Sequence, residues 1–198
     1  AIALLPETET CDAILQAWYA GQEGGTAIAD VLFGDYNPSG KLPVTFYKTT
    51  SQLPDYEDYS MKGRTYRYFT DALFPFGYGL SYTEWKVGNG QWKANADGTG
   101  VLTVDVTNAG KRNGTEIVQL YIRDLTDDDG PLKSLRGFAR VDVKAGQTSK
   151  AEISLSRESF EFWDASTNTM RVKPGKYEIL YGTSSLDKDL KTLTVELK

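Results

Sequence analysis

The stretch GQEGGTAIADVLFGDYNPSGKLP, residues 21–43, contains the signals of one short helix and of the turn that follows it. Three of its glycines precede the helix and permit a tight turn. Apolar residues three and four positions apart would form the buried face of this helix: Ile28, Val31 and Leu32. Gly34 is typical of a left-handed C-cap, and Asn37–Gly40 is typical of a second turn. We therefore predict a helix that begins at residue 25 or 26 and runs through Phe33.

The segments around this helix predict an incomplete α/β domain. The apolar run Ala1–Leu5 is consistent with a buried strand, and Asp12–Tyr19 with a helix that has Ile14, Leu15 and Trp18 on one face. Lys41–Phe46 is expected to be extended, because it contains a proline. Two helices and one strand cannot enclose a core. Residues 1–46 are therefore expected to be the C-terminal remnant of an α/β sandwich domain that packs on parts outside this sequence or on the downstream domain.

The middle of the chain, residues 47–81, reads as a connector rich in aromatic residues. Residues 47–59 are polar and rich in turn formers, which predicts a loop. Arg64–Phe69 alternates charged and aromatic side chains, which predicts an exposed strand or a segment that lies across a surface. Phe74–Leu80 interleaves aromatic residues with glycine. It is expected to pack between two domains rather than to act as a flexible linker.

From Tyr82 onward, apolar and polar residues alternate in short runs that are separated by turn residues. This pattern predicts about seven strands in an antiparallel β-sandwich of fibronectin type III or immunoglobulin type, over residues 82–198. The predicted strands are Val101–Val106, Glu116–Ile122, Leu135–Val143, Thr148–Leu155, Phe160–Trp163, Lys176–Tyr181 and Leu190–Leu197. Tyr177, which follows a Pro-Gly turn, is predicted to make the hydrogen bond of a tyrosine corner. The whole chain is thus expected to be an α+β remnant followed by an all-β domain.

Four segments in this order resemble the C-terminal part of the family 3 glycoside hydrolases, the β-glucosidases and β-xylosidases. They are GQEGGTAIADVLFGDYNPSGKLPVTF at residues 21–46, GRTYRYF at 63–69, FPFGYGLSYT at 74–83, and the β-rich tail. The resemblance implies the end of an α/β sandwich domain followed by a fibronectin type III-like domain. It also implies a periplasmic or secreted parent enzyme.

Composition excludes several classes of function. The chain of 198 residues carries a net charge of −5, which argues against nucleic acid or an anionic membrane as a partner. It has no apolar run of about 18 residues, the length that a membrane-spanning helix needs. It contains no histidine, so a Ser-His-Asp triad, a Cys-His pair and a histidine metal site are excluded. Carboxylate chemistry remains.

Retaining glycosidases need a pair of carboxylates, one nucleophile and one acid/base. In the family that this chain resembles, the nucleophile lies on an N-terminal barrel and the acid/base upstream of the GQEGG-type stretch, and neither motif occurs here. We therefore predict no catalytic residue, no metal and no cofactor. Glu23 is expected to bond backbone N–H groups at a helix N-terminus. The acidic residues around Asp124–Asp129 are expected to form a solvated loop, since they lack the ligand spacing of a calcium loop.

Four residues are the candidates for contact with sugar: Asp55, Arg64, Tyr66 and Arg67. Guanidinium forks and aromatic faces suit hydroxyl recognition and stacking. In the family that this chain resembles, the matching segment runs near a domain junction. The alternative is that these side chains serve interdomain packing, with ion pairs to Asp55, Glu57 or Asp58.

We expect the non-catalytic C-terminal portion of a retaining exo-β-glycosidase, inactive alone, whose partners are the upstream catalytic domains and a β-linked glycoside. The alternative is a stand-alone carbohydrate-binding or scaffold module without hydrolase activity. Exposed tryptophans would support that alternative, with Trp85, Trp92 and Trp163 as candidates. Because Trp163 stands beside Phe160 and Phe162, it is expected to lie in the core instead.

Overall fold

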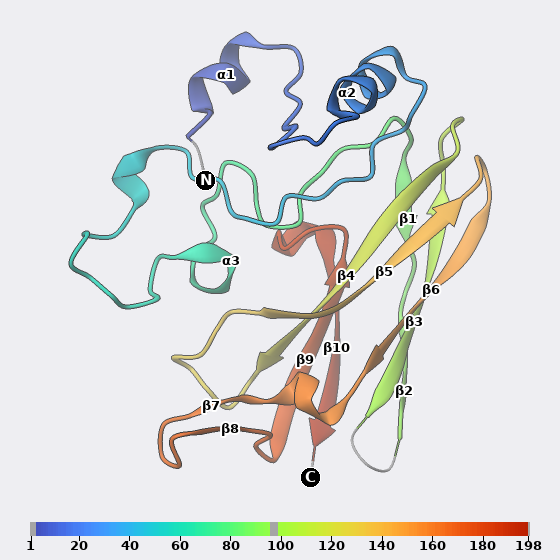
Figure 1. Ribbon diagram of the computed structural model, residues 1–198. Helices are drawn as coiled ribbons and strands as arrows, with labels where there is room; N and C mark the ends of the chain where they lie inside the picture. Colours follow the sequence, from blue (N-terminus) through green and yellow to red (C-terminus); the bar gives the residue numbers. More distant parts are fainter. Residues whose placement is uncertain (1–2, 96–98, 198) are drawn as a thin grey trace.

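The computed structural model describes residues 3–95 and 99–197. A β-sandwich forms one half of the molecule, and the N-terminal helical segment lies across one end of it (Figure 1). The first sheet has β3 (Gly100–Asn108) between β6 (Thr148–Leu155) and two short strands, β1 (Trp85–Val87) and β2 (Gln91–Ala94). The second sheet has the order β10-β9-β4-β5, with bounds Leu190–Leu197, Gly175–Gly182, Gly114–Asp124 and Ser134–Val143.

All pairings between neighbouring strands in both sheets are antiparallel, and the two sheets enclose one apolar core. Along β3, Leu102, Val104 and Val106 are buried at every second position. This alternation places the residues of one face of the sheet in the core. The core is built from Val, Ile, Leu and aromatic side chains of both sheets. The predicted antiparallel sandwich is confirmed.

Strand bounds follow the sequence pattern where alternation is regular. The predicted strands Thr148–Leu155 and Leu190–Leu197 coincide with β6 and β10. The predicted strand Phe160–Trp163 is displaced, because residue 160 ends the 3₁₀-helix η2 (Arg157–Phe160). The strand itself, β7 (Phe162–Asp164), forms a separate two-stranded hairpin with β8 (Thr169–Arg171). The short strands β1, β2 and β8 were not predicted.

The tyrosine corner is confirmed. Tyr177 is buried, and its hydroxyl donates to the carbonyl oxygen of Lys173 at 2.7 Å. The same hydroxyl accepts from the backbone N–H of Lys173 at 3.1 Å. Burial raises the pKa of Tyr177, so the phenol stays protonated and can donate.

The helix predicted in residues 21–43 is present as α2 (Gly24–Phe33). Gly34 ends it in the left-handed conformation with φ of 82°, as predicted for a C-cap. Glu23 is its N-cap residue, but its carboxylate makes no bond to a backbone N–H. Instead it accepts from the hydroxyl of Thr26, a residue of the first helical turn, at 3.1 Å.

Two predictions for the first twenty residues are wrong. Within the predicted strand Ala1–Leu5, residues 1–2 lie outside the described part of the chain. Leu5 begins the helix α1 (Leu5–Thr10), with proline in its first turn. Asp12–Tyr19 is not helical. Short helices depend on packing of their apolar face, and here the side chains of that face stay 42–51% exposed: Ile14, Leu15 and Trp18.

The connector holds the N-terminal segment to the sandwich through main-chain hydrogen bonds. Leu42 accepts from the N–H of Gly77 at 2.7 Å and donates to the carbonyl of Tyr78 at 2.8 Å. Phe46 donates to the carbonyl of Phe74 at 2.9 Å, and the two residues form an isolated β-bridge. On its other side the connector bonds to the sandwich, where Gly77 accepts from the amide of Gln119 at 3.0 Å and Phe76 accepts from the N–H of Ser185 at 3.0 Å.

One ion pair reinforces this junction. The Nζ of Lys41 lies 2.8 Å from Oε1 of Glu116 on β4, with side chains only 12% and 3% exposed. Asn37 also crosses the junction, accepting from Ser81 and from the N–H of Tyr82 and donating to the carbonyl of Asn113. The end of the helical segment is therefore fixed relative to the sandwich.

Candidate functional site

Arg64 organises the loop before α3. Its guanidinium donates to the backbone carbonyls of Asp55 (3.3 Å), Asp58 (2.5 Å) and Ser60 (3.0 Å). The Asp55 carboxylate accepts from the N–H of Glu57 at 2.9 Å. Arg64 therefore bonds main-chain oxygens of its own loop. The alternative to sugar contact had predicted ion pairs with the carboxylates of this loop instead.

The short helix α3 (Thr65–Tyr68) occupies the segment for which an exposed strand or a segment across a surface was predicted, and it is not a strand. It begins with strain, because Thr65 is β-branched and has a φ of 55°. The hydroxyl of Tyr47 accepts from the N–H of Thr65 at 3.2 Å and stabilises this conformation. Strained backbone in ordered structure is often found at functional sites. Here it turns the next two side chains toward the sandwich.

Tyr66 anchors α3 on the sandwich. Its hydroxyl accepts a hydrogen bond from the N–H of Leu135 at 3.0 Å, at the start of β5. Its ring stacks on Phe76 with centroids 4.3 Å apart, and meets the edge of buried Tyr121 at 5.7 Å. These contacts fix the position of the neighbouring Arg67.

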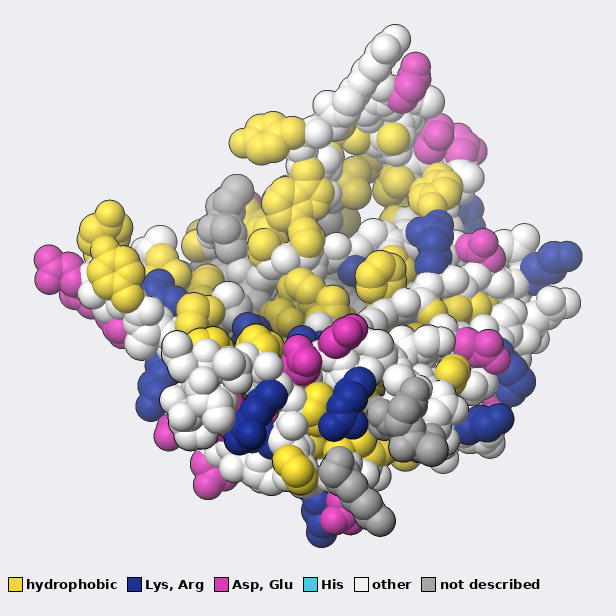
Figure 2. Space-filling model, turned by 60° about the horizontal axis from the view of Figure 1, so that its bottom comes forward, with side chains coloured by type: hydrophobic (Ala, Val, Ile, Leu, Met, Phe, Trp, Pro, Cys, Tyr) yellow, Lys and Arg dark blue, Asp and Glu magenta, His cyan; other side chains and the backbone are white. Residues whose placement is uncertain are grey.

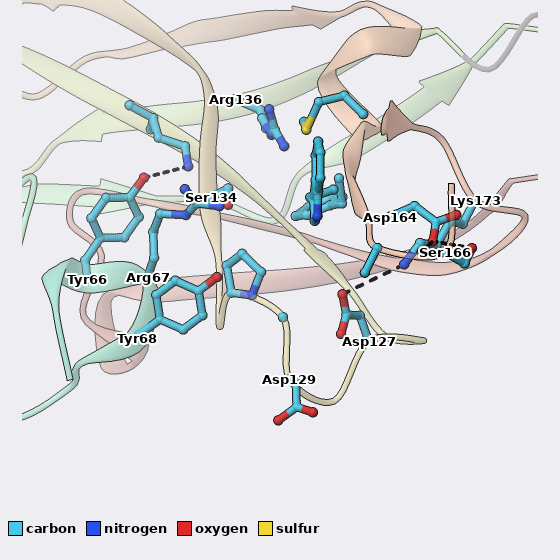
Figure 3. A pocket seen from close by; sticks show the side chains of 17 residues that line it. Tyr66, Arg67, Tyr68, Asp127, Asp129, Ser134, Arg136, Asp164, Ser166 and Lys173 are labelled. Carbon is cyan, nitrogen blue, oxygen red and sulfur yellow. Dashed lines mark hydrogen bonds and ion pairs between the residues drawn. The ribbon is translucent and has the colours of Figure 1, made fainter. Parts of the chain in front are cut away.

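Beside this anchor lies a cleft of about 710 Å³. Its walls come from four segments that are distant in sequence: α3, the loop 127–131, the first residues of β5, and the β7–β8 hairpin with Lys173 (Figure 3). Tyr66 and Arg67 line the cleft, whereas Asp55 and Arg64 belong to the loop before it. The structure thus separates the four predicted sugar contacts into two pairs.

Three lining residues, Arg67, Ser134 and Arg136, form what we call the cationic wall. Nε of both arginines and Oγ of Ser134 are buried and have no hydrogen-bond partner in the described part of the chain. Burial, followed by the nearby charge of Arg67, lowers the pKa of Arg136. Neither guanidinium pairs with a carboxylate within residues 3–95 and 99–197.

Arg136 is held in place from two sides. Its Nη2 donates to the carbonyl of Glu161 at 2.5 Å, and its Cζ lies 4.9 Å from the ring centroid of Phe162. Arg67 packs its guanidinium over the ring of Tyr68 at 5.8 Å. Both arginines are therefore oriented before any ligand arrives.

The opposite side of the cleft is an acidic rim, formed by Asp127 and Asp129 (Figure 3). Each forms a long ion pair with one lysine: Nζ of Lys173 lies 3.9 Å from a carboxylate oxygen of Asp127, and Nζ of Lys62 lies 3.8 Å from one of Asp129. These long ion pairs leave oxygen atoms of the rim open to other donors. No group of three or more Asp, Glu, Cys or His side chains in the described residues is arranged to hold a metal.

Asp164, by contrast, is fully engaged. It is buried, accepts from the hydroxyl and N–H of Ser166 and pairs with Arg171. The Ser166 hydroxyl, with its N–H and Arg171, lowers the pKa of Asp164 to about 2 against the opposing effect of burial. Asp164 therefore stabilises the β7–β8 hairpin, because it lies at the end of β7 and bonds residues of the turn and of β8.

Trp163 also lines the cleft and is 53% exposed, so its predicted core position is wrong. Residues on either side of it, Phe162 and Asp164, are buried, because successive side chains of a strand point to opposite faces. Trp85 and Trp92 pack against the core and provide no exposed platform. An aromatic surface therefore exists at Trp163 alone among the three tryptophans proposed for binding.

Sequence reasoning missed Ser134, Arg136 and the role of the acidic loop as a rim, and it named Trp163 as a candidate but favoured a core position for it. The exposure of Trp163 could have been read from the period-two pattern of its strand. No local signal marks the others, since the cleft exists only once the connector has docked on the sandwich.

The fold defines a fibronectin type III-like sandwich joined through a packed connector to part of a helical domain. Comparison with known families agrees with this: residues 1–82 match the glycosyl hydrolase family 3 C-terminal domain, and residues 116–185 match the fibronectin type III-like domain. The chain belongs to glycosyl hydrolase family 3 and corresponds to the C-terminal part of its members.

Similar proteins are full-length glycosidases. A xylan 1,4-β-xylosidase from Xylanibacter ruminicola is 72% identical over all of this chain, which covers 23% of that protein. A periplasmic β-glucosidase from Salmonella typhimurium is 40% identical over 93% of this chain and 26% of its own length. The chain thus spans about a quarter of these relatives.

Solved structures agree with the fold. A β-glucosidase from Kluyveromyces marxianus matches 98% of this chain and 25% of its own, with a TM-score of 0.86 and 32% identity. One from Erythrobacter marinus matches 100% of this chain and 27% of its own, with a TM-score of 0.84 and 38% identity. None of the helices in the described part is long and apolar enough to cross a membrane.

Proposed function

We propose that this chain is the non-catalytic C-terminal portion of an exo-acting, retaining β-glycosidase that releases xylose from β-linked xylosides. The catalytic carboxylates would lie upstream, and this portion would complete and stabilise the domain that carries them. Preference for xyloside over glucoside is supported by the 72% identity to a β-xylosidase, against 40% to a β-glucosidase.

The observation that carries this proposal is an uncovered apolar surface on the N-terminal segment. Five large side chains there are 42–84% exposed: Ile14, Leu15, Trp18, Leu32 and Phe33. Hydrophobic side chains gather in the upper part of Figure 2, where the N-terminal helices lie. The helix α2 buries no residue. Contiguous apolar surface of this kind marks an interface.

The occupant that fits this surface is the rest of the α/β domain. This chain corresponds to only 23–26% of its relatives, so most of the parent protein is available to cover the surface. The sandwich, in contrast, encloses its own apolar core between its two sheets. We place the parent in the periplasm or outside the cell, supported by the periplasmic relative.

The first test is the intact mass of the native gene product and its hydrolysis of aryl β-xyloside and β-glucoside. We expect a product roughly four times longer than this chain, from the coverage of its relatives, with higher kcat/KM on the xyloside. The 198-residue chain should hydrolyse neither. A native product of 22.0 kDa would overturn the proposal and favour a stand-alone carbohydrate-binding module.

Paired variants test the interface itself. Phe33→Asp should lower the melting temperature and activity of the native product, because it places a charge against the covering domain. In the isolated chain, where Phe33 is 84% exposed, the same change should be neutral. Phe138→Asp, at a side chain 66% exposed on β5, serves as the control. Equal tolerance of both changes in the native product would contradict the assigned interface.

A further inference from the structure

Among the described residues, no carboxylate forms an ion pair with the cationic wall, although the charge of Glu161 acts on Arg136 as a minor influence. Two guanidiniums and one hydroxyl carry buried donor atoms without partners, and all three residues line the same cavity. Leaving a buried polar atom unpaired costs free energy, and more so when the group is charged. These three atoms are closed to solvent, so a ligand in the cleft would meet the two guanidiniums through their Nη groups.

The wall is shaped for a carboxylate. A guanidinium presents planar N–H donors whose spacing matches the two oxygens of a carboxylate. Arg67 and Arg136 lie close enough for the charge of one to lower the pKa of the other, and a shared anion would relieve that repulsion. Ser134, only 5% exposed at the start of β5, completes this wall, but its hydroxyl oxygen is closed to solvent.

The rest of the cleft selects against a polyanion. Asp127 and Asp129 on the acidic rim would repel a ligand with several negative charges, such as a nucleic acid or a polyphosphate. The same carboxylates accept hydrogen bonds from hydroxyl groups. Trp163, half-exposed in the cleft, offers a flat apolar face on which the C–H face of a pyranose ring can stack.

We propose that this cleft binds an acidic saccharide, a sugar chain that carries a uronic acid. The carboxylate of the uronic acid meets Arg67 and Arg136, the sugar ring lies against Trp163, and hydroxyl groups donate to the acidic rim. This goes beyond the proposed hydrolase role, because it concerns recognition by the sandwich and requires no catalysis.

A protein segment with an acidic side chain is the competing occupant. It satisfies the cationic wall, but it makes no use of the aromatic face and the acidic rim together. The saccharide accounts for all three features, and we therefore favour it.

The test is calorimetric titration of the 198-residue chain with a glucuronic acid-substituted xylo-oligosaccharide. A neutral xylo-oligosaccharide of equal length and a short Glu-containing peptide are the comparison ligands. We expect the acidic saccharide to bind at least tenfold more tightly than either, since a charge-assisted bond to a desolvated guanidinium is the main difference. Its affinity should fall with added salt.

Variants separate recognition from folding. Arg67→Met should weaken binding of the acidic saccharide at least tenfold. The melting temperature of this variant should equal or exceed that of the wild type, because an unpaired buried charge is removed. Trp163→Ala should weaken acidic and neutral sugars alike. Arg123→Gln, at a half-exposed arginine on β4 outside the cleft, is the control.

Three results would overturn the proposal: no binding at millimolar saccharide, equal affinity for the neutral chain, or tighter binding of the peptide. An unchanged affinity in Arg67→Met would do the same. Each of these outcomes is independent of whether the native product hydrolyses xylosides, so this inference and the proposed function can fail separately.

Discussion

Gly77 is a position in the connector where a single added methyl group should destabilise the fold. Its φ is +78°, and a Cβ there would lie 1.9 Å from Oε1 of Gln119. Gln119 is 3% exposed, and its amide donates to the carbonyls of Gly77 at 3.0 Å and of Thr183 at 2.8 Å. Gly77→Ala must therefore expel this side chain from the junction.

The expected cost follows from two separate contributions. A left-handed conformation costs a residue with a Cβ about 1–2 kcal/mol, partly offset by the lower entropy of the unfolded chain. Loss of the three Gln119 side-chain bonds adds about 2–3 kcal/mol, because two carbonyls and the buried hydroxyl of Tyr121 lose their partner. Gly146 is the matched control, with φ of +71° and nothing within 4 Å of a Cβ. We expect a total of about 3–5 kcal/mol for Gly77→Ala and about 1 kcal/mol for Gly146→Ala.

The assay is urea denaturation followed by tryptophan fluorescence and circular dichroism, combined in a double-mutant cycle. In a Gln119→Ala background the colliding amide is absent, so Gly77→Ala should cost no more than Gly146→Ala. The reasoning is refuted if the two glycine variants are equally stable in the wild-type background. It also fails if the cost of Gly77→Ala is the same with and without the Gln119 side chain.

Two further predictions concern the sandwich. Tyr177→Phe should lower the free energy of unfolding in urea by about 1–2 kcal/mol, because the carbonyl of Lys173 loses its donor. Tyr59→Phe, at a side chain 90% exposed, should leave it unchanged. Equal effects of the two changes would count against the tyrosine corner. Asp164 has a folded-state pKa of about 2, below its ordinary 3.8, so it stabilises the fold above about pH 4, and that contribution disappears as the pH falls toward 2. The melting temperature of Asp164→Asn should thus lie below that of the wild type at pH 6 and approach it near pH 2. A difference that stays constant with pH would show that the charge of Asp164 does not stabilise the fold through Ser166 and Arg171.

The sandwich could be predicted from sequence because its information is local. Alternation along β3 and β6 places one face of each strand in a core that the chain itself supplies. The helix predicted at Asp12–Tyr19 failed for the complementary reason: its apolar face stays about half exposed, and Trp18 meets only the edge of Phe46 in the described part of the chain. Propensity alone does not stabilise a short helix in water.

The cleft could be predicted only in part. The charged and aromatic pattern of Arg64–Phe69 pointed to Tyr66 and Arg67, which line it. Arg136 and Trp163 lie about 70 and 95 residues further along the chain, and only the fold brings them to the same cleft. Asp55 and Arg64 share the composition of a sugar site, but the nearest acceptors of Arg64 are the carbonyls of its own loop.

The main-chain bonds between residues 42–46 and 74–78 have an implication for how such enzymes diversify. Hydrogen bonds between backbone N–H and C=O groups tolerate most substitutions, because every residue except proline offers the same two groups. A joint held by such bonds is compatible with the agreement in fold with a relative only 32% identical, at a TM-score of 0.86. It also implies that sandwiches are exchangeable parts: chimeras joined within this segment should keep their geometry even when the donor enzymes act on different sugars.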